Sequence, residues 1–320
     1  MIHGKKISIV IPVYNVGDGI ITLIQKVPDF IDRVYLVDDK CPINTGKKYE
    51  NSNQYNNKVK VIYNNKNLGV GGAVKAGYRE SIKDHYEFII KMDGDNQMDP
   101  TQIEKLIDPL LKGYNYSKGN RFLGKHRIKN YPLPRLYGNI FLSLFSKLSS
   151  GYWDIYDPIN GFTAIKRECL INLNLEGIDN GYFFETDMMY NLYLGRNRIK
   201  DVSVDIKYFK DHIQNMSLIK ESFNFFSKNL SRFYKRIKTT YFNNNFTLGT
   251  FFITTFILSG LFTLFYGGSN YLHYRSLNSF TPTGIIVISS SFLLLTFLSL
   301  MIFLILDNIN NPNNPNNPNR

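Results

Sequence analysis

The segment Phe88-Ile89-Ile90-Lys91-Met92-Asp93-Gly94-Asp95-Asn96-Gln97 joins a short apolar run to a turn with two carboxylates. The apolar part, residues 88–92, has the length and composition of a buried strand. Asp93 and Asp95 follow directly, one residue apart, so both side chains can reach one divalent cation at the strand tip. The segment therefore predicts a buried strand that carries a pair of oxygen ligands to its carboxyl end.

Similar apolar runs lie on both sides of this segment and alternate with helical patterns. Runs rich in Val, Ile and aromatic residues predict strands at residues 7–14, 34–38, 58–63, 88–92, 162–165 and 202–206. Helices are predicted between them at residues 19–30, 71–83, 100–112 and 133–148. Such alternation is typical of an α/β fold with a mostly parallel sheet and helices on both faces. Ligands of these sheets bind at the carboxyl ends of the strands.

The chain of 320 residues has a formal net charge of +12, and much of the excess precedes the first long apolar run. Basic proteins bind nucleic acid, anionic lipid or phosphate-bearing ligands. The position of this charge favours a membrane surface, so we expect no nucleic-acid partner. Cys41 and Cys169 form no Cys/His cluster, which argues against a zinc site and for two reduced thiols. The basic residues are Lys207, Lys210, Lys220, Lys228, Arg232, Lys235, Arg236 and Lys238.

Residues 211–245 form a basic amphipathic segment with apolar side chains at helical spacing. One interpretation is a surface helix packed on the preceding domain. The other is an interfacial helix that lies among lipid headgroups. The position directly before a long apolar run favours the second interpretation. The apolar positions are Ile219, Phe223, Phe226, Leu230, Phe233 and Ile237.

Residues 246–266 and 284–306 contain no charged side chain, and each run is long enough to cross the hydrocarbon core of a bilayer. We therefore predict two transmembrane helices. Because basic residues flank the first span, residues 1–210 are expected to form a cytoplasmic domain. The remaining residues, 307–320, repeat Asn-Asn-Pro and have little to bury, so we predict a disordered tail.

Three segments of the predicted domain carry candidate chemistry. Asp93 and Asp95 suit Mg²⁺ or Mn²⁺, which proteins bind through a few carboxylates and substrate phosphates. Asp38-Asp39 ends a predicted strand and would contact a base or a ribose, or else cap a turn. Residues 67–77 form a Gly-rich turn that enters a helix, an arrangement that lets the backbone approach a ligand closely. This turn spells neither a P-loop nor GxGxxG, which disfavours a dinucleotide enzyme.

Together these segments resemble a family 2 glycosyltransferase with a GT-A fold, in the branch of polyprenyl-phosphate sugar synthases. The resemblance covers roughly residues 7–210, with the motifs in family order, and it implies that residues 1–210 are the catalytic domain. The matching stretches are Ile9-Val10-Ile11-Pro12-Val13-Tyr14-Asn15, Val37-Asp38-Asp39, Asn67-Leu68-Gly69, Asp93-Gly94-Asp95-Asn96-Gln97, Gly119-Asn120-Arg121-Phe122, Asp157-Pro158-Ile159-Asn160-Gly161-Phe162 and Phe184-Glu185-Thr186-Asp187.

The resemblance implies a donor site for a nucleotide-diphosphate sugar and a metal site for Mg²⁺ or Mn²⁺. The implied metal site comprises Asp93, Asp95 and Gln97. The implied donor site departs from the family pattern at two places. Val16 stands where the family usually has Glu, and the turn after Asp39 reads Lys40-Cys41-Pro42. The implied nucleotide-sugar contacts are Pro12, Tyr14, Asn15, Asp38, Asp39, Asn67, Gly69, Gly72, Lys75, Asp93 and Gln97.

The acceptor decides which further residues are needed. A lipid phosphate is already ionised and needs cations. The resemblance implies Arg121 and Arg135 for this role, since they match two arginines that this branch places on the acceptor phosphate. A sugar hydroxyl needs a general base. The resemblance implies Glu185 and Asp187, which stand where other family 2 enzymes carry this base, although Glu185 is alternatively a structural carboxylate that orients an Arg or Lys. Asp157 would line the acceptor site or cap a turn.

The leading hypothesis is an inverting transfer to a polyprenyl phosphate by an integral membrane protein, with membrane lipids as partners. Transfer to a glycan or glycolipid hydroxyl is the alternative, and a non-catalytic, membrane-tethered nucleotide-binding protein is the second. Assembly into a homo-oligomer is left open.

Overall fold

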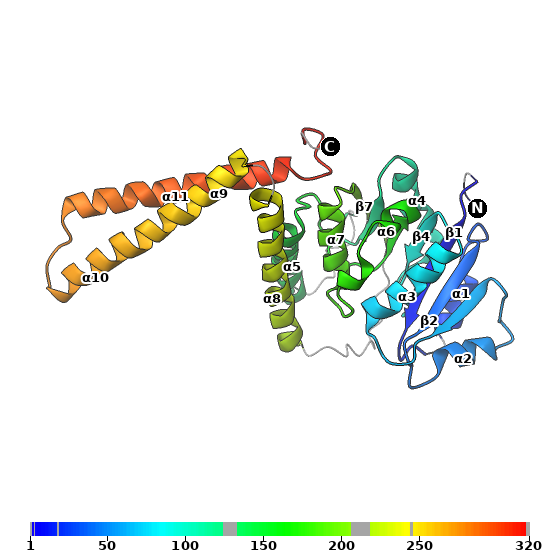
Figure 1. Ribbon diagram of the computed structural model, residues 1–320. Helices are drawn as coiled ribbons and strands as arrows, with labels where there is room; N and C mark the ends of the chain where they lie inside the picture. Colours follow the sequence, from blue (N-terminus) through cyan, green and yellow to red (C-terminus); the bar gives the residue numbers. More distant parts are fainter. Residues whose placement is uncertain are drawn as a thin grey trace. The chain divides into compact units, whose positions relative to one another are not determined.

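The computed structural model describes residues 2, 4–17, 19–123, 133–205, 218–243 and 246–317, with side chains omitted for 133–141 and 218–222. The chain divides into two compact units, residues 1–233 and 234–320 (Figure 1). The boundary falls within one helix, α8 (Leu218–Ile237). Each unit is described by itself.

The first unit is built on a seven-stranded sheet with the strand order β3-β2-β1-β4-β6-β5-β7. Its pairs are parallel except those of β6, which runs antiparallel to both β4 and β5. The predicted α/β fold with a mostly parallel sheet is therefore confirmed. The strands are β1 (Ile7–Val13), β2 (Arg33–Asp38), β3 (Val59–Tyr63), β4 (Phe88–Lys91), β5 (Tyr116–Asn120), β6 (Thr163–Lys166) and β7 (Ile199–Ser203).

Helices cover both faces of the sheet, and each face has its own buried apolar cluster. On one face, alternate β1 residues such as Ile9 pack against α1 (Gly19–Gln25), α2 (Thr45–Glu50) and α4 (Ile103–Leu111). On the other, Val10 packs with α3 (Val70–Lys83), α6 (Arg167–Ile171) and α7 (Phe184–Leu194). Burial of both faces explains why the strands read as nearly continuous apolar runs.

The sequence patterns missed β5, because three of its five residues carry polar side chains. All five are nevertheless buried. Tertiary hydrogen bonds compensate this burial: Ser117 Oγ bonds the carbonyl of Leu106, and Asn120 Nδ2 donates to Asp201 Oδ2 at 2.5 Å. Hydrophobic periodicity cannot find a strand whose polar groups are satisfied in this way.

The amphipathic segment forms α8, which packs on α7 and on α5 (Leu133–Ser150) through an aromatic and polar face. Phe225 meets Phe183 edge-on at a centroid separation of 5.5 Å, and Asn229 accepts a 2.6 Å hydrogen bond from Ser149. On its other side, Phe223 is 75% exposed. One face of α8 therefore packs on the preceding domain, as the first interpretation expected. Contact of the exposed face with lipid headgroups, the second interpretation, stays a prediction.

The second unit contains two helices, Leu248–Ser276 and Thr283–Ile309, that are long and apolar enough to cross a membrane. Their most apolar windows have mean hydropathies of 1.9 and 2.5. Most large apolar side chains along them are exposed, as suits contact with lipid rather than a protein core. The first helix extends beyond the predicted end at residue 266, through a π-helical turn at Thr263–Gly267.

The expected disordered tail differs from what the structure describes. Asp307 lies inside the second helix, and residues 311–317 form hydrogen-bonded turns. Asn317 is buried and donates to the carbonyl oxygens of Asn310 and Asn311. The asparagine side chains thus satisfy backbone carbonyls, a role that a composition argument does not reveal.

A buried ion pair joins two helices of the second unit. Arg236 is fully buried and donates to both carboxylate oxygens of Asp307, at 2.7 and 2.9 Å. The Tyr241 hydroxyl donates a third bond to Asp307 at 2.8 Å. Such a pair is costly to break, because the remaining partner is left as an uncompensated buried charge.

We predict that Arg236→Met lowers the stability of the second unit by about 3–5 kcal/mol, because Asp307 is then left buried and unpaired. The loss should be seen as a reduced thermal midpoint of the full chain in detergent. The paired variant Arg236→Met with Asp307→Leu should recover most of the loss. An unchanged midpoint in the single variant would contradict this role.

Candidate functional site

A cleft of about 890 Å³ opens at the carboxyl edge of the sheet, where β1, β2 and β4 end. Its size suits a ligand larger than a single sugar. The cleft brings together most of the predicted donor-site residues, from segments far apart in the sequence. The predicted residues that line it are Pro12, Tyr14, Asn15, Asp39, Asn67, Gly69, Asp93, Asp95 and Glu185.

The acidic turn lies in this cleft, and a buried lysine holds it. Lys91 Nζ is 2.7 Å from Asp93 Oδ1 and 2.6 Å from Glu185 Oε1. Burial opposes the charge on Lys91, but the two carboxylates outweigh it and raise the pKa of the ammonium. Asp95 Oδ1 accepts the backbone N–H of Gln97 at 3.1 Å, which orders the turn. Both carboxylates therefore have fixed places at the strand tip.

The turn offers oxygen ligands but no complete metal cage. Among the described residues, no three His, Cys, Asp or Glu side chains gather as a metal-binding cluster. Two carboxylates beside an open cleft are instead the donor set of a Mg²⁺ or Mn²⁺ site that is completed by substrate phosphates. Asp93 and Asp95 fit such a shared site. Gln97 does not line the cleft.

Asp39 organises the Gly-rich turn on the opposite wall of the cleft. Its carboxylate accepts the backbone N–H groups of Leu68 and Gly69, at 2.9 and 2.8 Å, and the amide of Asn64 at 2.7 Å. Gly69 has φ +80°, and a side chain there would collide with the carbonyl of Asn180. The turn is therefore shaped by the protein's own carboxylate before any ligand binds.

Three residues predicted to bind the nucleotide have other partners and do not line the cleft. Asp38 is buried and accepts the N–H groups of Cys41 and Gly46, at 2.7 and 2.9 Å. Lys75 is buried and donates to the carbonyl of Ile178 at 2.8 Å. Gly72 donates its N–H to Asn180. Each group contributes to holding the loops together, and its predicted contact with the nucleotide stays a prediction.

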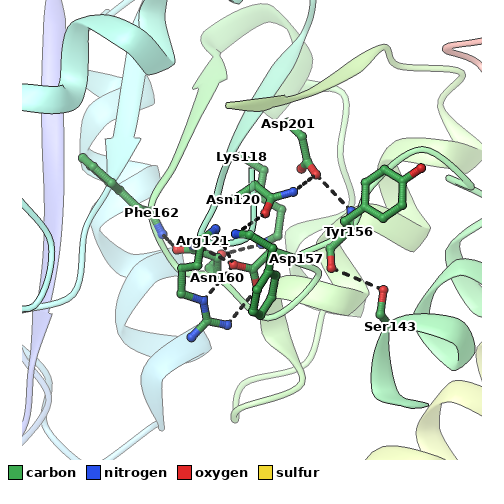
Figure 2. A network of polar contacts seen from close by, with 10 residues as sticks. Lys118, Asn120, Arg121, Ser143, Tyr156, Asp157, Asn160, Phe162 and Asp201 are labelled. Atoms are coloured by element: carbon green, nitrogen blue, oxygen red, sulfur yellow. Dashed lines mark hydrogen bonds and ion pairs between the residues drawn. The ribbon is translucent and has the colours of Figure 1, made fainter. Parts of the chain in front are cut away.

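Arg121 and Asp157, which do not line the cleft, form one ion-paired unit (Figure 2). Arg121 donates from Nε and Nη2 to the two oxygens of Asp157, both at 2.7 Å. The Arg121 side chain keeps 19% of its surface exposed, whereas that of Asp157 is buried. Asp157 therefore sets the direction of a guanidinium that a ligand can still reach. The side chain of Arg135, the second predicted arginine, lies outside the described residues.

This pair adjoins a polar network that sequence reasoning missed (Figure 2). Lys118 is buried, which lowers its pKa to about 8, and its ammonium bonds the carbonyl of Asn160. Burial likewise raises the pKa of Asp201 to about 6. Asp201 Oδ2 accepts from Asn120 and from the N–H of Tyr156, but Oδ1 is buried without a hydrogen-bond partner. The network ties β5, β7 and the loop that carries Asp157.

Asp187, a predicted general base, is buried outside the cleft lining. Its Oδ2 accepts the N–H of Asp179 and a 2.7 Å bond from Arg232, whose Nε also lies 2.6 Å from Oδ1. A parallel ion pair joins Lys228 to Asp179 at 2.5 Å. Burial raises the pKa of Asp187, and Arg232 opposes that shift. These contacts give Asp187 the role of docking α8 onto α7.

A mixed sheet with an acidic turn in a cleft at its carboxyl edge defines a GT-A glycosyltransferase architecture. Residues 8–173, more than half of the chain, match the family model described as glycosyl transferase family 2. The chain therefore belongs to glycosyl transferase family 2, which confirms the resemblance seen in its motifs.

Two curated relatives share the family. The polyprenol monophosphomannose synthase of Mycolicibacterium smegmatis is 26% identical over 190 residues, which cover 58% of this chain and 71% of that protein. The dolichol-phosphate mannosyltransferase of Pyrococcus furiosus is 30% identical over 186 residues. That match covers 54% of this chain and 49% of the Pyrococcus protein, so the chain spans about half of that relative.

Among solved structures, this chain resembles glucosyl-3-phosphoglycerate synthase from Mycobacterium tuberculosis in complex with Mn²⁺, uridine diphosphate and phosphoglyceric acid. The TM-score is 0.54 at 21% identity, and the match covers 72% of this chain and 79% of that one. At this identity the likeness shows a shared fold.

The network in Figure 2 predicts a pH-dependent stability. Asp201 has a higher pKa in the folded chain than its ordinary value of 3.8, so the folded state binds the proton more tightly. Its contribution to stability is complete below pH ~4 and is lost as pH rises through about 6, a change of about 3 kcal/mol. The variant Asp201→Asn has no carboxyl group to titrate at this position, so its stability should lack this pH-dependent contribution.

Thermal midpoints of wild type and Asp201→Asn, compared in detergent between pH 4 and 7, measure this effect. The variant should gain stability relative to wild type as pH rises. Parallel profiles for the two proteins would show that Asp201 titrates normally.

Proposed function

We propose that the protein transfers a sugar from a nucleotide diphosphate to a polyprenyl phosphate, with inversion, at the cytoplasmic face of a membrane. One observation carries the choice of acceptor: each carboxylate that was a candidate base is held by a cation. Glu185 pairs with Lys91, and Asp187 pairs with Arg232.

These pairs matter because the two acceptor classes differ in their need for a base. A hydroxyl must lose its proton as it attacks, and a carboxylate that is already bound to a cation is a weak base for that purpose. A phosphate monoester is ionised at neutral pH and has no proton to lose. It needs cations that offset the repulsion between two phosphate-bearing substrates, and Arg121 is a partly exposed cation of this kind.

In the proposed reaction, the bond between the anomeric carbon and the diphosphate breaks as an acceptor phosphate oxygen bonds that carbon from the opposite side. Asp93 and Asp95 would hold Mg²⁺ or Mn²⁺, which when bound supplies positive charge for the departing diphosphate. Asp39 keeps the Gly-rich turn in the shape that forms the donor wall. Arg121, oriented by Asp157, receives the acceptor phosphate.

The membrane supplies the lipid acceptor. Two helices of the required length and apolarity follow the catalytic unit, and α8 precedes them with Phe223 and Leu230 exposed. We infer that α8 rests on the membrane surface by this face while its other face packs on α5 and α7. The basic residues near the first span favour a cytoplasmic location for the site. The two curated relatives, named for polyprenol and dolichol phosphates, support this acceptor class.

The direct test pairs two acceptors that differ only in the phosphate. Membranes with the protein, divalent cation and labelled donors (glucose, mannose and their N-acetyl forms) should label polyprenyl phosphate but not polyprenol. Asp95→Asn should reduce transfer by at least about 100-fold, since it removes one of two metal ligands. Labelling of polyprenol instead would favour a hydroxyl acceptor, and transfer that survives Asp95→Asn or chelation would overturn the metal assignment.

A second test separates docking from base catalysis at Asp187. Because Asp187 pairs with Arg232, both Asp187→Asn and Arg232→Met should cost about 3 kcal/mol of stability, seen as lower thermal midpoints. The turnover number of each variant, per folded enzyme, should stay within about tenfold of wild type, whereas loss of a general base costs 10²–10⁴-fold. A turnover loss of that size confined to Asp187→Asn would identify Asp187 as a base.

A further inference from the structure

Two lysines lie in one row across the sheet, below the cleft. Lys91 on β4 pairs in register with Thr163 on β6, and Thr163 pairs in turn with Lys118 on β5. Residues directly opposite in antiparallel strands point to the same face, so both ammonium groups lie on the face covered by α7. Both lysines are almost fully buried, although Lys is among the residues least often found inside proteins.

Of the two, only Lys91 lines the cleft. Its ammonium lies between Asp93 Oδ1 and Glu185 Oε1, at 2.7 and 2.6 Å. Gly161 leaves the room for this arrangement, because a side chain there would collide with Lys91 Nζ and with Asp93 Oδ2. The Lys91 ammonium is therefore a fixed positive charge in direct contact with Asp93, one of the two proposed metal ligands.

A divalent cation and Lys91 compete for the same carboxylate. Metal binding at Asp93 brings like charges together in a partly buried site, where the repulsion is screened less than in water. A nucleotide diphosphate adds negative charge and oxygen ligands, which offset that repulsion. The free protein should consequently bind the metal weakly, and the protein with bound nucleotide should bind it firmly.

We propose that Lys91 is a positioning residue that makes metal binding conditional on the nucleotide diphosphate, through its hold on Asp93. This inference rests on the proposed function, since it assumes that the acidic turn receives a metal and a diphosphate. Coupling of this kind is reciprocal, so the metal tightens nucleotide binding by the same factor as the nucleotide tightens metal binding. The free turn then keeps an ordered shape, with Lys91 offsetting the charge of Asp93.

The test compares Glu185→Gln with the double variant Lys91→Met/Glu185→Gln, each as the full chain in detergent. The single change Lys91→Met would leave Glu185 buried and unpaired, so the double variant is the one expected to fold. The two proteins differ only at Lys91, and thermal midpoints verify that each is folded. Mn²⁺ dissociation constants are measured by electron paramagnetic resonance, with and without uridine or guanosine diphosphate.

Without nucleotide, the double variant should bind Mn²⁺ about tenfold more tightly than Glu185→Gln, because the competing charge is gone. The gain in Mn²⁺ affinity on adding nucleotide should be large in wild type and at least about fivefold smaller in the double variant. A merely structural lysine, serving only to neutralise Glu185, would leave wild type and both variants with the same Mn²⁺ affinity. That outcome, with nucleotide binding intact, overturns the inference alone. Failure of wild type to bind either nucleotide, even with Mn²⁺, would overturn the proposed function as well.

Discussion

Buried carboxylates need cations or hydrogen-bond donors that satisfy their charge, and this requirement shapes the first unit. Glu185 and Asp187 are on the same helix, yet each is bound to a different element, through Lys91 of β4 and Arg232 of α8. Asp157 is bound to Arg121 at the end of β5. These ion pairs join the sheet, the loops and the helix that precedes the apolar hairpin. Among them, the pair of Glu185 with Lys91 lies in the cleft lining, which links the packing of the unit to the chemistry proposed for it.

Much of the fold could be predicted because the central strands are buried on both faces and therefore strongly apolar. Strands β1 to β4 and helix α3 lie close to their predicted ranges. β5 could not be predicted, because Lys118 and Asn120 are polar residues whose partners come from distant segments. The hydrogen-bonded turns of residues 311–317 were not predicted for a similar reason, since the Asn317 side chain donates hydrogen bonds to backbone carbonyls.

The cleft lining was predictable where its residues form contiguous motifs, as at Asp93 and Asp95. It was not predictable where two neighbouring residues of the same type have different roles. Asp38 and Asp39 are adjacent in sequence, but Asp38 holds the turn after β2 and Asp39 holds the Gly-rich turn in the cleft. Lys91 closely precedes the acidic turn, but the motif alone gives it no role. A lysine that ends an otherwise apolar strand was the available signal, because such a charge needs a buried partner.

The linkage formed in the product tests the central claim most directly. Mass spectrometry of lipids extracted from cells that express the protein would identify the molecule that accepts the sugar. Treatment of these lipids with mild acid would show whether the bond to the sugar is acid-labile. The account predicts a hexose joined to polyprenyl phosphate through a phosphodiester, released by mild acid and missing when Asp95 is changed to Asn. A sugar attached to a lipid or glycan hydroxyl by an acid-stable bond would contradict it.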